Sequence, residues 1–178
     1  MWSIRVRLQL EQHRRDLALF NLAIDGKQRG CDLVRLRVSD VCVGGRVQDR
    51  ATVTRQKTGR PVQFEITEQT RSSIRDWLSE ADLRSRRYLF PSRFRAPPHL
   101  STRQYARIVH AWVESAGLNS SAYGTHSMRR TKVAQIYRKT GNLRAIQLLF
   151  GHTKLESTVR YLGIEVDDAL SIAEQVEL

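Results

Sequence analysis

The heptapeptide GTHSMRR, residues 124–130, places a histidine and an arginine three positions apart. On a helix, His126 and Arg129 would face the same way, so both side chains could contact one phosphate group. Arginine suits this task because its planar guanidinium donates two parallel hydrogen bonds to phosphate oxygens, and histidine exchanges protons near neutral pH. Taken alone, such a pair is more often the solvated face of a basic helix, so the motif needs support from elsewhere in the chain.

A second group of reactive side chains lies in GHTKLESTVRY, residues 151–161. A glycine between two expected helices exposes His152 near a helix start, and Tyr161 ends the short helix that follows. A tyrosine phenol has an ordinary pKa of about 10, so attack at neutral pH requires nearby cations or a base that stabilise the phenolate. For a tyrosine taken alone, packing in the core or at its rim is the simpler interpretation.

The order of the motifs along the chain is more specific than any one of them. The stretch KQRGCDLVRLRVSD comes first, the turn sequence QKTGRPV second, and HSMRR, Gly-His at 151–152 and Tyr161 follow. This ordered set resembles the catalytic domain of the tyrosine recombinases, the phage integrase family, from about residue 11 to the C-terminus. The resemblance implies the fold of that domain and an enzyme that cuts and rejoins DNA.

Carried over residue by residue, the resemblance assigns catalytic roles to six side chains: Arg29, Lys57, His126, Arg129, His152 and Tyr161. Asp32 follows three residues after Arg29, where the family usually has a glutamate, and is expected to orient its neighbours. The chain has Gly26, Lys27 and Gln28 before this arginine, where the family more often has Thr-Gly-Leu. Contacts with the DNA backbone are expected from Arg55, Arg60 and Arg130.

The reaction that the resemblance implies is phosphoryl transfer to the protein. Tyr161 attacks a DNA phosphodiester, forming a 3′-phosphotyrosyl link and releasing a 5′-hydroxyl, so the bond energy is kept for religation. Arg29 and Arg129 neutralise the non-bridging oxygens in the transition state, and the second histidine adds a hydrogen bond. Lys57 protonates the leaving oxygen, while His126 assists proton transfer at the tyrosine. No metal cofactor is implied, because the arginines supply positive charge and the sequence has no carboxylate cluster at metal spacing.

Other functions stay open beside the site-specific recombinase. A type IB topoisomerase-like enzyme would share the chemistry but relax a single duplex, whereas a recombinase exchanges strands between two duplexes. A catalytically inert basic DNA-binding or regulatory module would form no covalent adduct. Charge alone also leaves room for an RNA-binding module of the ribosomal type.

Helical periodicity dominates the elements that must position these side chains. We expect helices at 11–25, 31–41, 68–81, 103–117, 125–139, 142–150, 153–162 and 165–176. Thr67 is a predicted cap, Ser101 or Thr102 opens the next helix, and Gly117 is a predicted helix stop. Residues 46–66 predict two short antiparallel strands joined by the turn that carries Lys57. The expected fold class is mainly α with one small antiparallel β-hairpin.

The net charge indicates the partner. The 178 residues carry a formal net charge of +12, a surplus that attracts polyanions, so double-stranded DNA is the expected partner. The basic body ends in an acidic tail, because residues 162–178 contain five acidic residues and no Lys or Arg. Residues 165–178 are expected either to reach a neighbouring protomer in a synaptic tetramer on DNA or to fold back onto their own domain.

The length and composition predict a single catalytic domain over 1–178, with residues 1–10 as a lead-in and no separate N-terminal DNA-clamping domain. No signal peptide and no apolar run of about 18 residues is present, so we expect a cytoplasmic, nucleoid-associated protein without a membrane partner. Cys31 and Cys42 lack metal-type spacing and are expected to be reduced.

Overall fold

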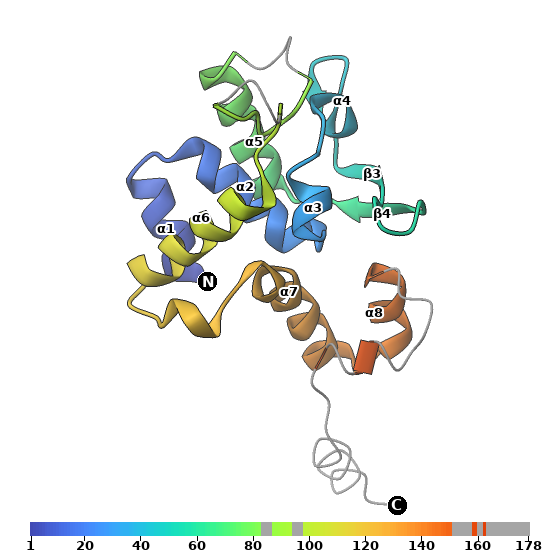
Figure 1. Ribbon diagram of the computed structural model, residues 1–178. Helices are drawn as coiled ribbons and strands as arrows, with labels where there is room; N and C mark the ends of the chain where they lie inside the picture. Colours follow the sequence, from blue (N-terminus) through green and yellow to red (C-terminus); the bar gives the residue numbers. More distant parts are fainter. Residues whose placement is uncertain (83–86, 94–97, 151–157, 160–161, 163–178) are drawn as a thin grey trace, which may run out of the picture. The chain divides into compact units, whose positions relative to one another are not determined.

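The computed structural model describes residues 1–82, 87–93, 98–150, 158–159 and 162 (Figure 1). The chain divides into two compact units, Met1–Lys132 and Val133–Leu178. Helices predominate and the strands form small antiparallel pairs, which confirms the expected fold class. Among the described helices, none combines the length and the apolar character needed to cross a membrane.

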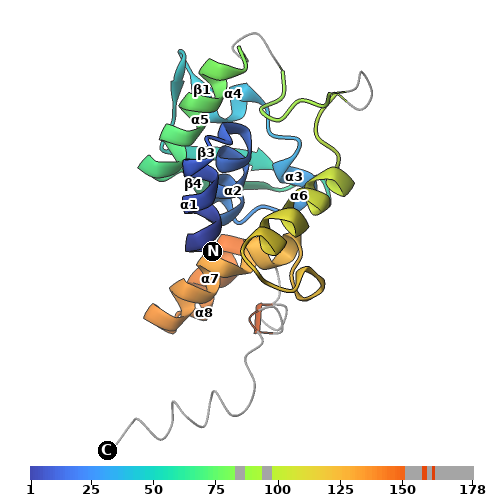
Figure 2. The same cartoon turned by 90° about the vertical axis from the view of Figure 1, so that its left-hand side faces the viewer.

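The first unit is built around helix α2 (Arg14–Gly26), which is buried continuously from Ala18 to its end. Helices α1 (Trp2–Leu10) and α5 (Glu68–Glu80) lie beside α2 (Figures 1 and 2). Residues 1–10, expected only as a lead-in, are therefore a packed helix that buries Ile4 and Leu8. These two residues are four positions apart and share one helix face, a weak signal that the sequence analysis did not use.

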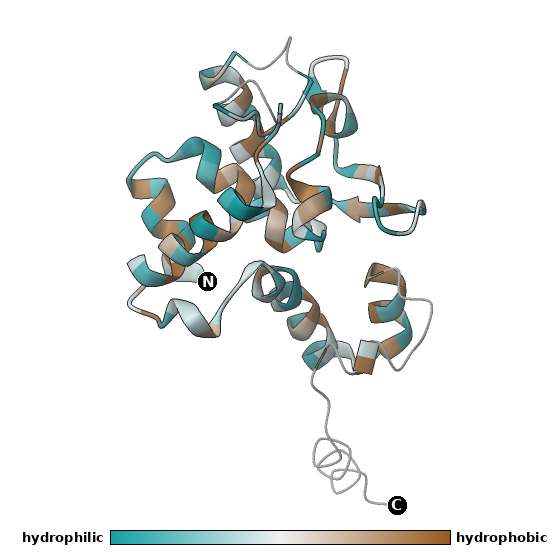
Figure 3. Cartoon of the chain, in the orientation of Figure 1, coloured by the Kyte–Doolittle hydropathy of each residue, from teal (hydrophilic) through white to brown (hydrophobic). Residues whose placement is uncertain are grey.

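The long helices start where their caps predict. The Thr67 hydroxyl accepts a hydrogen bond from the N–H of Thr70 at the start of α5, and Ser101 caps α6 (Thr102–Ser115) through the N–H of Gln104. In α6 the buried residues are Tyr105, Ile108, Val109, Trp112 and Val113. Hydrophobic and hydrophilic residues occupy the same helices in Figure 3, as expected when one face packs and the other faces water. The 3-10 turn η2 (Ser120–Ala122) precedes helix α7 (Thr125–Thr140).

The predicted helix at 31–41 is wrong. Two short helices occupy this stretch, α3 (Gly30–Leu33) and α4 (Val38–Val41). Arg37 interrupts them with extended backbone, φ −91° and ψ 155°, and forms an isolated β-bridge with Tyr88. The Asp40 carboxylate then accepts a hydrogen bond from the Arg37 N–H at 2.8 Å, which satisfies the start of α4.

The predicted hairpin is confirmed as strands β3 (Arg50–Thr54) and β4 (Pro61–Glu65). Ala51 pairs with Phe64 in the register, and both side chains are buried against the helices. A second, smaller hairpin that the sequence analysis did not predict joins β1 (Cys42–Val43) to β2 (Arg46–Val47). Its turn is Gly44-Gly45, with φ of +56° and +75°, a conformation that glycine adopts without steric cost.

The second unit contains the end of α7 and helix α8 (Leu143–Phe150). Val133, Ile146 and Phe150 form its core, with Tyr137 and Leu149 packed against them. Gly141, with φ +60°, ends α7 before the next helix begins. Of the helix predicted at 153–162, only Thr158, Val159 and Leu162 are described, and all three are helical; the helix predicted at 165–176 lies outside the described residues.

Candidate phosphate-binding site

Arg29 lies where α2 gives way to α3, in the first unit. The chain leaves α2 through Lys27, whose φ of +51° is left-handed, and returns to extended backbone at Arg29. A Cβ added at Gly30 would lie 3.3 Å from ring carbons of Tyr105, so the missing side chain lets α6 pack directly against the backbone beside Arg29. Within the described structure, Arg29 Nη1 is buried without a hydrogen-bond partner. Among the described residues this donor is therefore available to a ligand such as a phosphate oxygen.

Arg129 reaches the same region from α7. Its side chain is buried, and its Nε donates a hydrogen bond of 2.8 Å to the backbone carbonyl of Lys27, 102 residues earlier in the chain. The carbonyl that accepts this bond lies two residues before Arg29. The two arginines predicted to bind the same phosphate are thus brought to one short stretch of backbone.

Asp32 connects α3 to the hairpin turn. It is buried, and its Oδ1 accepts a hydrogen bond of 3.0 Å from the N–H of Gln56, the residue before Lys57. Its other oxygen, Oδ2, is buried with no partner among the described residues. Asp32 therefore binds the backbone at the start of the turn, while Lys57 and Arg60 are exposed on the turn itself.

Arg55, expected to contact the DNA backbone from the surface, is instead buried with 1% of its surface exposed. Burial, together with the charges of Arg129 and Arg29, lowers the pKa of Arg55 to about 10, although the charge of Asp32 opposes this shift. Arg55 is consequently a third guanidinium inside the cluster. The signal was present in the sequence, because Ala51 and Val53 alternate on the inward side of β3 and Arg55, one residue beyond the strand, continues the alternation.

The remaining predicted site residues are either exposed or outside the described residues. His126 and Arg130 are exposed on the first turns of α7. His152 and Tyr161 lie outside the described residues. The structure thus brings together Arg29, Asp32 and Arg129, places Lys57 next to the residue bound by Asp32, and says nothing of the predicted nucleophile.

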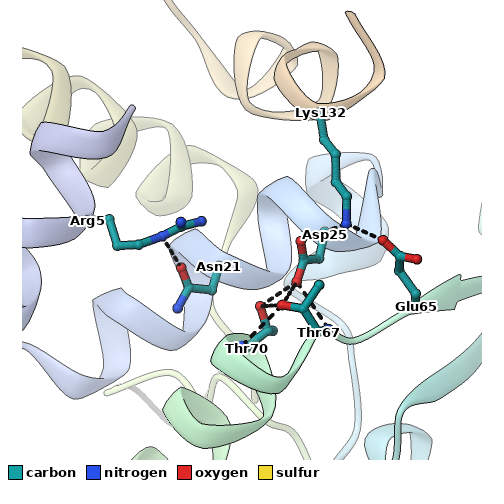
Figure 4. Close-up of polar contacts among 7 residues, drawn as sticks. All are labelled: Arg5, Asn21, Asp25, Glu65, Thr67, Thr70 and Lys132. Atoms are coloured by element: carbon teal, nitrogen blue, oxygen red, sulfur yellow. Dashed lines mark hydrogen bonds and ion pairs between the residues drawn. The ribbon is translucent and has the colours of Figure 1, made fainter. Parts of the chain in front are cut away.

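A second polar cluster, which was not predicted from the sequence, surrounds Asp25 and Lys132 (Figure 4). Lys132 extends from α7 to pair with Asp25 at 3.0 Å and also with Glu65. Asp25 accepts hydrogen bonds of 2.5 Å from each of the Thr67 and Thr70 hydroxyls. No sequence motif connects these partners, since Lys132 is 107 residues from Asp25.

The pKa values of the second cluster follow from its contacts. Burial raises the pKa of Asp25, but hydrogen bonds from Thr67, Thr70 and Lys132 outweigh it and hold that pKa below its ordinary value. The hydrogen bond from Lys132 likewise lowers the pKa of Glu65. Burial lowers the pKa of Lys132, but its bonds to Glu65 and Asp25 raise it overall. All three groups are therefore charged at neutral pH.

The arginine cluster as a whole suits the binding of an anion. The charges of Arg29, Arg129 and Asp32 all act on the buried Arg55, in a partly desolvated setting where electrostatic interactions are stronger than in water. In the part of the chain that the structure describes, no group of three or more His, Cys, Asp or Glu side chains could hold a metal ion. The arrangement can stabilise negative charge that grows on a phosphate during reaction.

Comparison with known proteins gives consistent matches. The model of the Phage integrase family matches residues 8–166. The chain is 30% identical over 159 residues to "Probable integrase/recombinase YoeC" of Bacillus subtilis (strain 168), covering 89% of this chain and 82% of that protein. It is 28% identical over 163 residues to tyrosine recombinase XerC of Chromobacterium violaceum, covering 90% of this chain and 52% of XerC. The chain thus spans about half the length of that XerC.

Solved structures share the fold at lower sequence identity. XerA recombinase superposes with a TM-score of 0.77 at 19% identity, covering 98% of this chain and 63% of XerA. XerH recombinase, bound to a palindromic difH substrate in a post-cleavage complex, superposes with a TM-score of 0.73 at 20% identity. This second match covers 90% of this chain and 46% of XerH.

Proposed function

The chain belongs to the phage integrase family, and we propose that it is a site-specific DNA recombinase that cuts and rejoins DNA through a covalent protein–DNA link. The observation that carries the proposal is the convergence of Arg29 and Arg129 on the backbone around Lys27. Both are named by the resemblance, and they lie far apart in the sequence, beside α3 and on α7. If His126 and Arg129 were only the solvated face of a basic helix, Arg129 would be exposed, whereas it is buried.

The proposed nucleophile is Tyr161. Its phenolic oxygen bonds to the phosphorus of a DNA phosphodiester, and the bond from phosphorus to the 5′-oxygen breaks. The phenolic proton leaves with the help of His126, and Lys57 supplies a proton to the departing 5′-oxygen. The product is a 3′-phosphotyrosyl link with a free 5′-hydroxyl, and attack by a 5′-hydroxyl from either strand reverses the step.

The arginines act on the phosphate during this exchange. Negative charge grows on the non-bridging oxygens in the transition state, and Arg29 and Arg129 are proposed to donate hydrogen bonds to them, with His152 as a further donor. Arg55 supports the same region with a third positive charge. Because the bond to the Lys27 carbonyl orients Arg129 before DNA binds, this arginine needs little reorganisation at the moment of reaction.

Double-stranded DNA is the proposed substrate and partner. The XerH relative of similar fold was solved with its DNA substrate, and the net charge of +12 on this chain favours a polyanion. The exposed Lys57, Arg60 and Arg130 are proposed to contact the DNA. Exchange between two sites further requires a tetramer on DNA, for which residues 165–178 are the proposed contact.

A covalent-capture experiment tests the proposal. The full chain is incubated with a nicked duplex that traps the cleaved state, and a denaturation-resistant protein–DNA adduct is expected. Tyr161→Phe should form none, because it lacks the attacking oxygen. An adduct that persists in this variant would identify a different nucleophile, whereas no adduct from the unmodified chain on any duplex would favour an inert DNA-binding module. Strand transfer between two duplexes distinguishes a recombinase from a nicking and closing enzyme.

A further inference from the structure

A set of four charges lies next to the arginines but has no part in the proposed phosphoryl transfer: Asp25, Lys27, Glu65 and Lys132. Lys27 and Asp25 are only 2% and 5% exposed. Charged groups are costly to bury unless they are paired, so two lysines and two carboxylates in one place largely offset each other. We call these four residues the charge lock.

Each lysine of the charge lock lies within three residues of one of the proposed catalytic arginines. Lys132 follows Arg129 by three residues on α7, so the two side chains occupy neighbouring turns on one side of the helix. Lys27 precedes Arg29 by two residues, and its carbonyl accepts the hydrogen bond from Arg129 Nε. The charge lock therefore joins the two chain segments at the point where the arginines meet.

Lys27 occupies a position that favours glycine. Its φ of +51° is costly for a residue with a Cβ, and burial lowers the pKa of Lys27, as does the nearby charge of Lys132. Glu65 and Asp25 oppose this by attracting its ammonium group. Attraction to the same two carboxylates that bind Lys132 gives a physical reason for a lysine here.

We propose that Lys132 is a positioning residue for DNA cleavage. By pairing with Asp25 and Glu65, Lys132 holds the Arg129 turn of α7 against the Lys27 carbonyl, so that the guanidinium is oriented before DNA arrives. The catalytic consequence rests on the proposed function, but the contact itself is a property of the protein without DNA. The two parts can therefore be tested separately.

The contact is tested by nuclear magnetic resonance of the full chain, through solvent exchange of the Arg129 Nε–H proton. Its signal is assigned by its loss in Arg129→Lys. Lys132→Met keeps the length of the side chain but removes both ion pairs, and should speed this exchange by about tenfold or more. Lys132→Arg preserves the pairs and should exchange at the unmodified rate, as should Lys139→Met, which removes an exposed lysine from the same helix.

Exchange that is unchanged in Lys132→Met would overturn the proposal. Glu65→Gln provides a milder second variant, because Glu65 is half-exposed and its loss removes one of the two pairs. Its exchange rate should fall between those of the unmodified chain and Lys132→Met. If Lys132→Met does not fold, an unmodified rate in Glu65→Gln overturns the proposal by itself.

The catalytic consequence is measured by single-turnover cleavage of the nicked duplex at saturating protein. Lys132→Met should lower the rate constant by about 10- to 100-fold with DNA affinity nearly unchanged, since a small misplacement of a catalytic group has effects of this size. Lys132→Arg should restore most of the rate. A smaller reacting fraction at an unmodified rate constant would show a purely stabilising role and overturn the proposal. If the unmodified chain forms no adduct, the proposed function is contradicted. The exchange rate of the Arg129 Nε–H proton would still show whether Lys132 holds Arg129 against the Lys27 carbonyl.

Discussion

At the scale of single residues, the site depends on how each guanidinium is held. Arg129 uses Nε to bind a backbone carbonyl, and Asp32 uses one oxygen to bind a backbone N–H. Such contacts to the main chain depend on the backbone path of α3 and the hairpin rather than on another flexible side chain. Substitutions that keep the charge of a side chain but change its hydrogen-bonding geometry therefore test whether that geometry matters for cleavage.

Replacing Arg129 with lysine should abolish most of the cleavage although the charge is retained. A lysine has one ammonium group, which cannot keep the geometry of the bond to the Lys27 carbonyl and also reach the phosphate as a guanidinium does. We expect the single-turnover cleavage rate to fall by about 100-fold or more, with DNA affinity nearly unchanged. An equal loss in rate and in affinity would mean that Arg129 only anchors the DNA.

The Asp25 carboxylate predicts a pH dependence of stability. Because contacts in the folded state lower the pKa of Asp25, its stabilising contribution is present above the unfolded value of about 3.9 and is lost as pH falls through the lower folded value. The stability advantage of the unmodified chain over Asp25→Asn should be constant near neutral pH and shrink below about pH 4. Urea unfolding at several pH values measures it, and an advantage that persists undiminished in acid would contradict this account.

At the scale of elements, the path of the chain between α2 and α3 sets the position of Arg29. The backbone turns at Lys27 and then passes so close to Tyr105 of α6 that only a glycine fits easily at position 30. Tyr105 is almost fully buried, and burial raises the pKa of its phenol. A ring enclosed in this way has little room to move aside.

Gly30→Ala should consequently lower the free energy of unfolding by about 1 kcal/mol or more through overpacking against the Tyr105 ring. Gly124→Ala is the matched control, because a Cβ at that position meets nothing within 4 Å. Chemical unfolding should show the control unchanged within about 0.5 kcal/mol. Equal effects of the two substitutions would show that the contact with Tyr105 does not limit the packing.

Local sequence patterns predicted the helices and strands well where the helix cap or the alternation of buried residues lies within the element itself. Caps at Thr67 and Ser101 and the alternation of Ala51 and Val53 required only neighbouring residues. The stretch 31–41 was predicted incorrectly because Arg37 takes its extended conformation from a bridge to Tyr88, which is distant in sequence.

The site was predicted only as far as the family motifs extend. The motifs name Arg29, Asp32 and Arg129, which lie close together in the structure, but burial of Arg55 depends on which face of β3 turns inward, and the charge lock joins residues up to 107 positions apart. Pairing at such distances has no local pattern in one sequence. The catalytic roles of all six residues remain predictions, and His152 and Tyr161 lie outside the described residues.

At the scale of the whole molecule, we expect charge to govern the encounter with the proposed DNA partner. The positive surplus is carried by many arginines, of which some, such as Arg55, are buried and others, such as Arg60, are exposed. Exposed arginines that contact phosphates release counterions when DNA binds, and this makes affinity depend on salt. Buried arginines contribute to the site rather than to that dependence.

Arg60→Gln should weaken DNA binding about equally for every sequence and reduce the slope of log affinity against log salt by about 1. Fluorescence anisotropy with duplexes of different sequence, over a series of salt concentrations, measures both quantities. Glu114→Gln, on the exposed side of α6, is a control that should leave the slope unchanged. A loss of affinity confined to one DNA sequence would indicate that Arg60 reads bases instead.

The placement of the tryptophans has a spectroscopic consequence. All three, Trp2, Trp77 and Trp112, belong to the Met1–Lys132 unit. Trp112 is buried edge-on against Phe20, whereas Trp2 is 76% exposed, so their emission should differ in wavelength. Intrinsic tryptophan fluorescence therefore reports on the Met1–Lys132 unit, which carries Arg29, Arg55 and Arg129. The Val133–Leu178 unit, which contains the proposed nucleophile, has no tryptophan to report on it. A tryptophan introduced at Tyr137 would give that second unit a signal of its own.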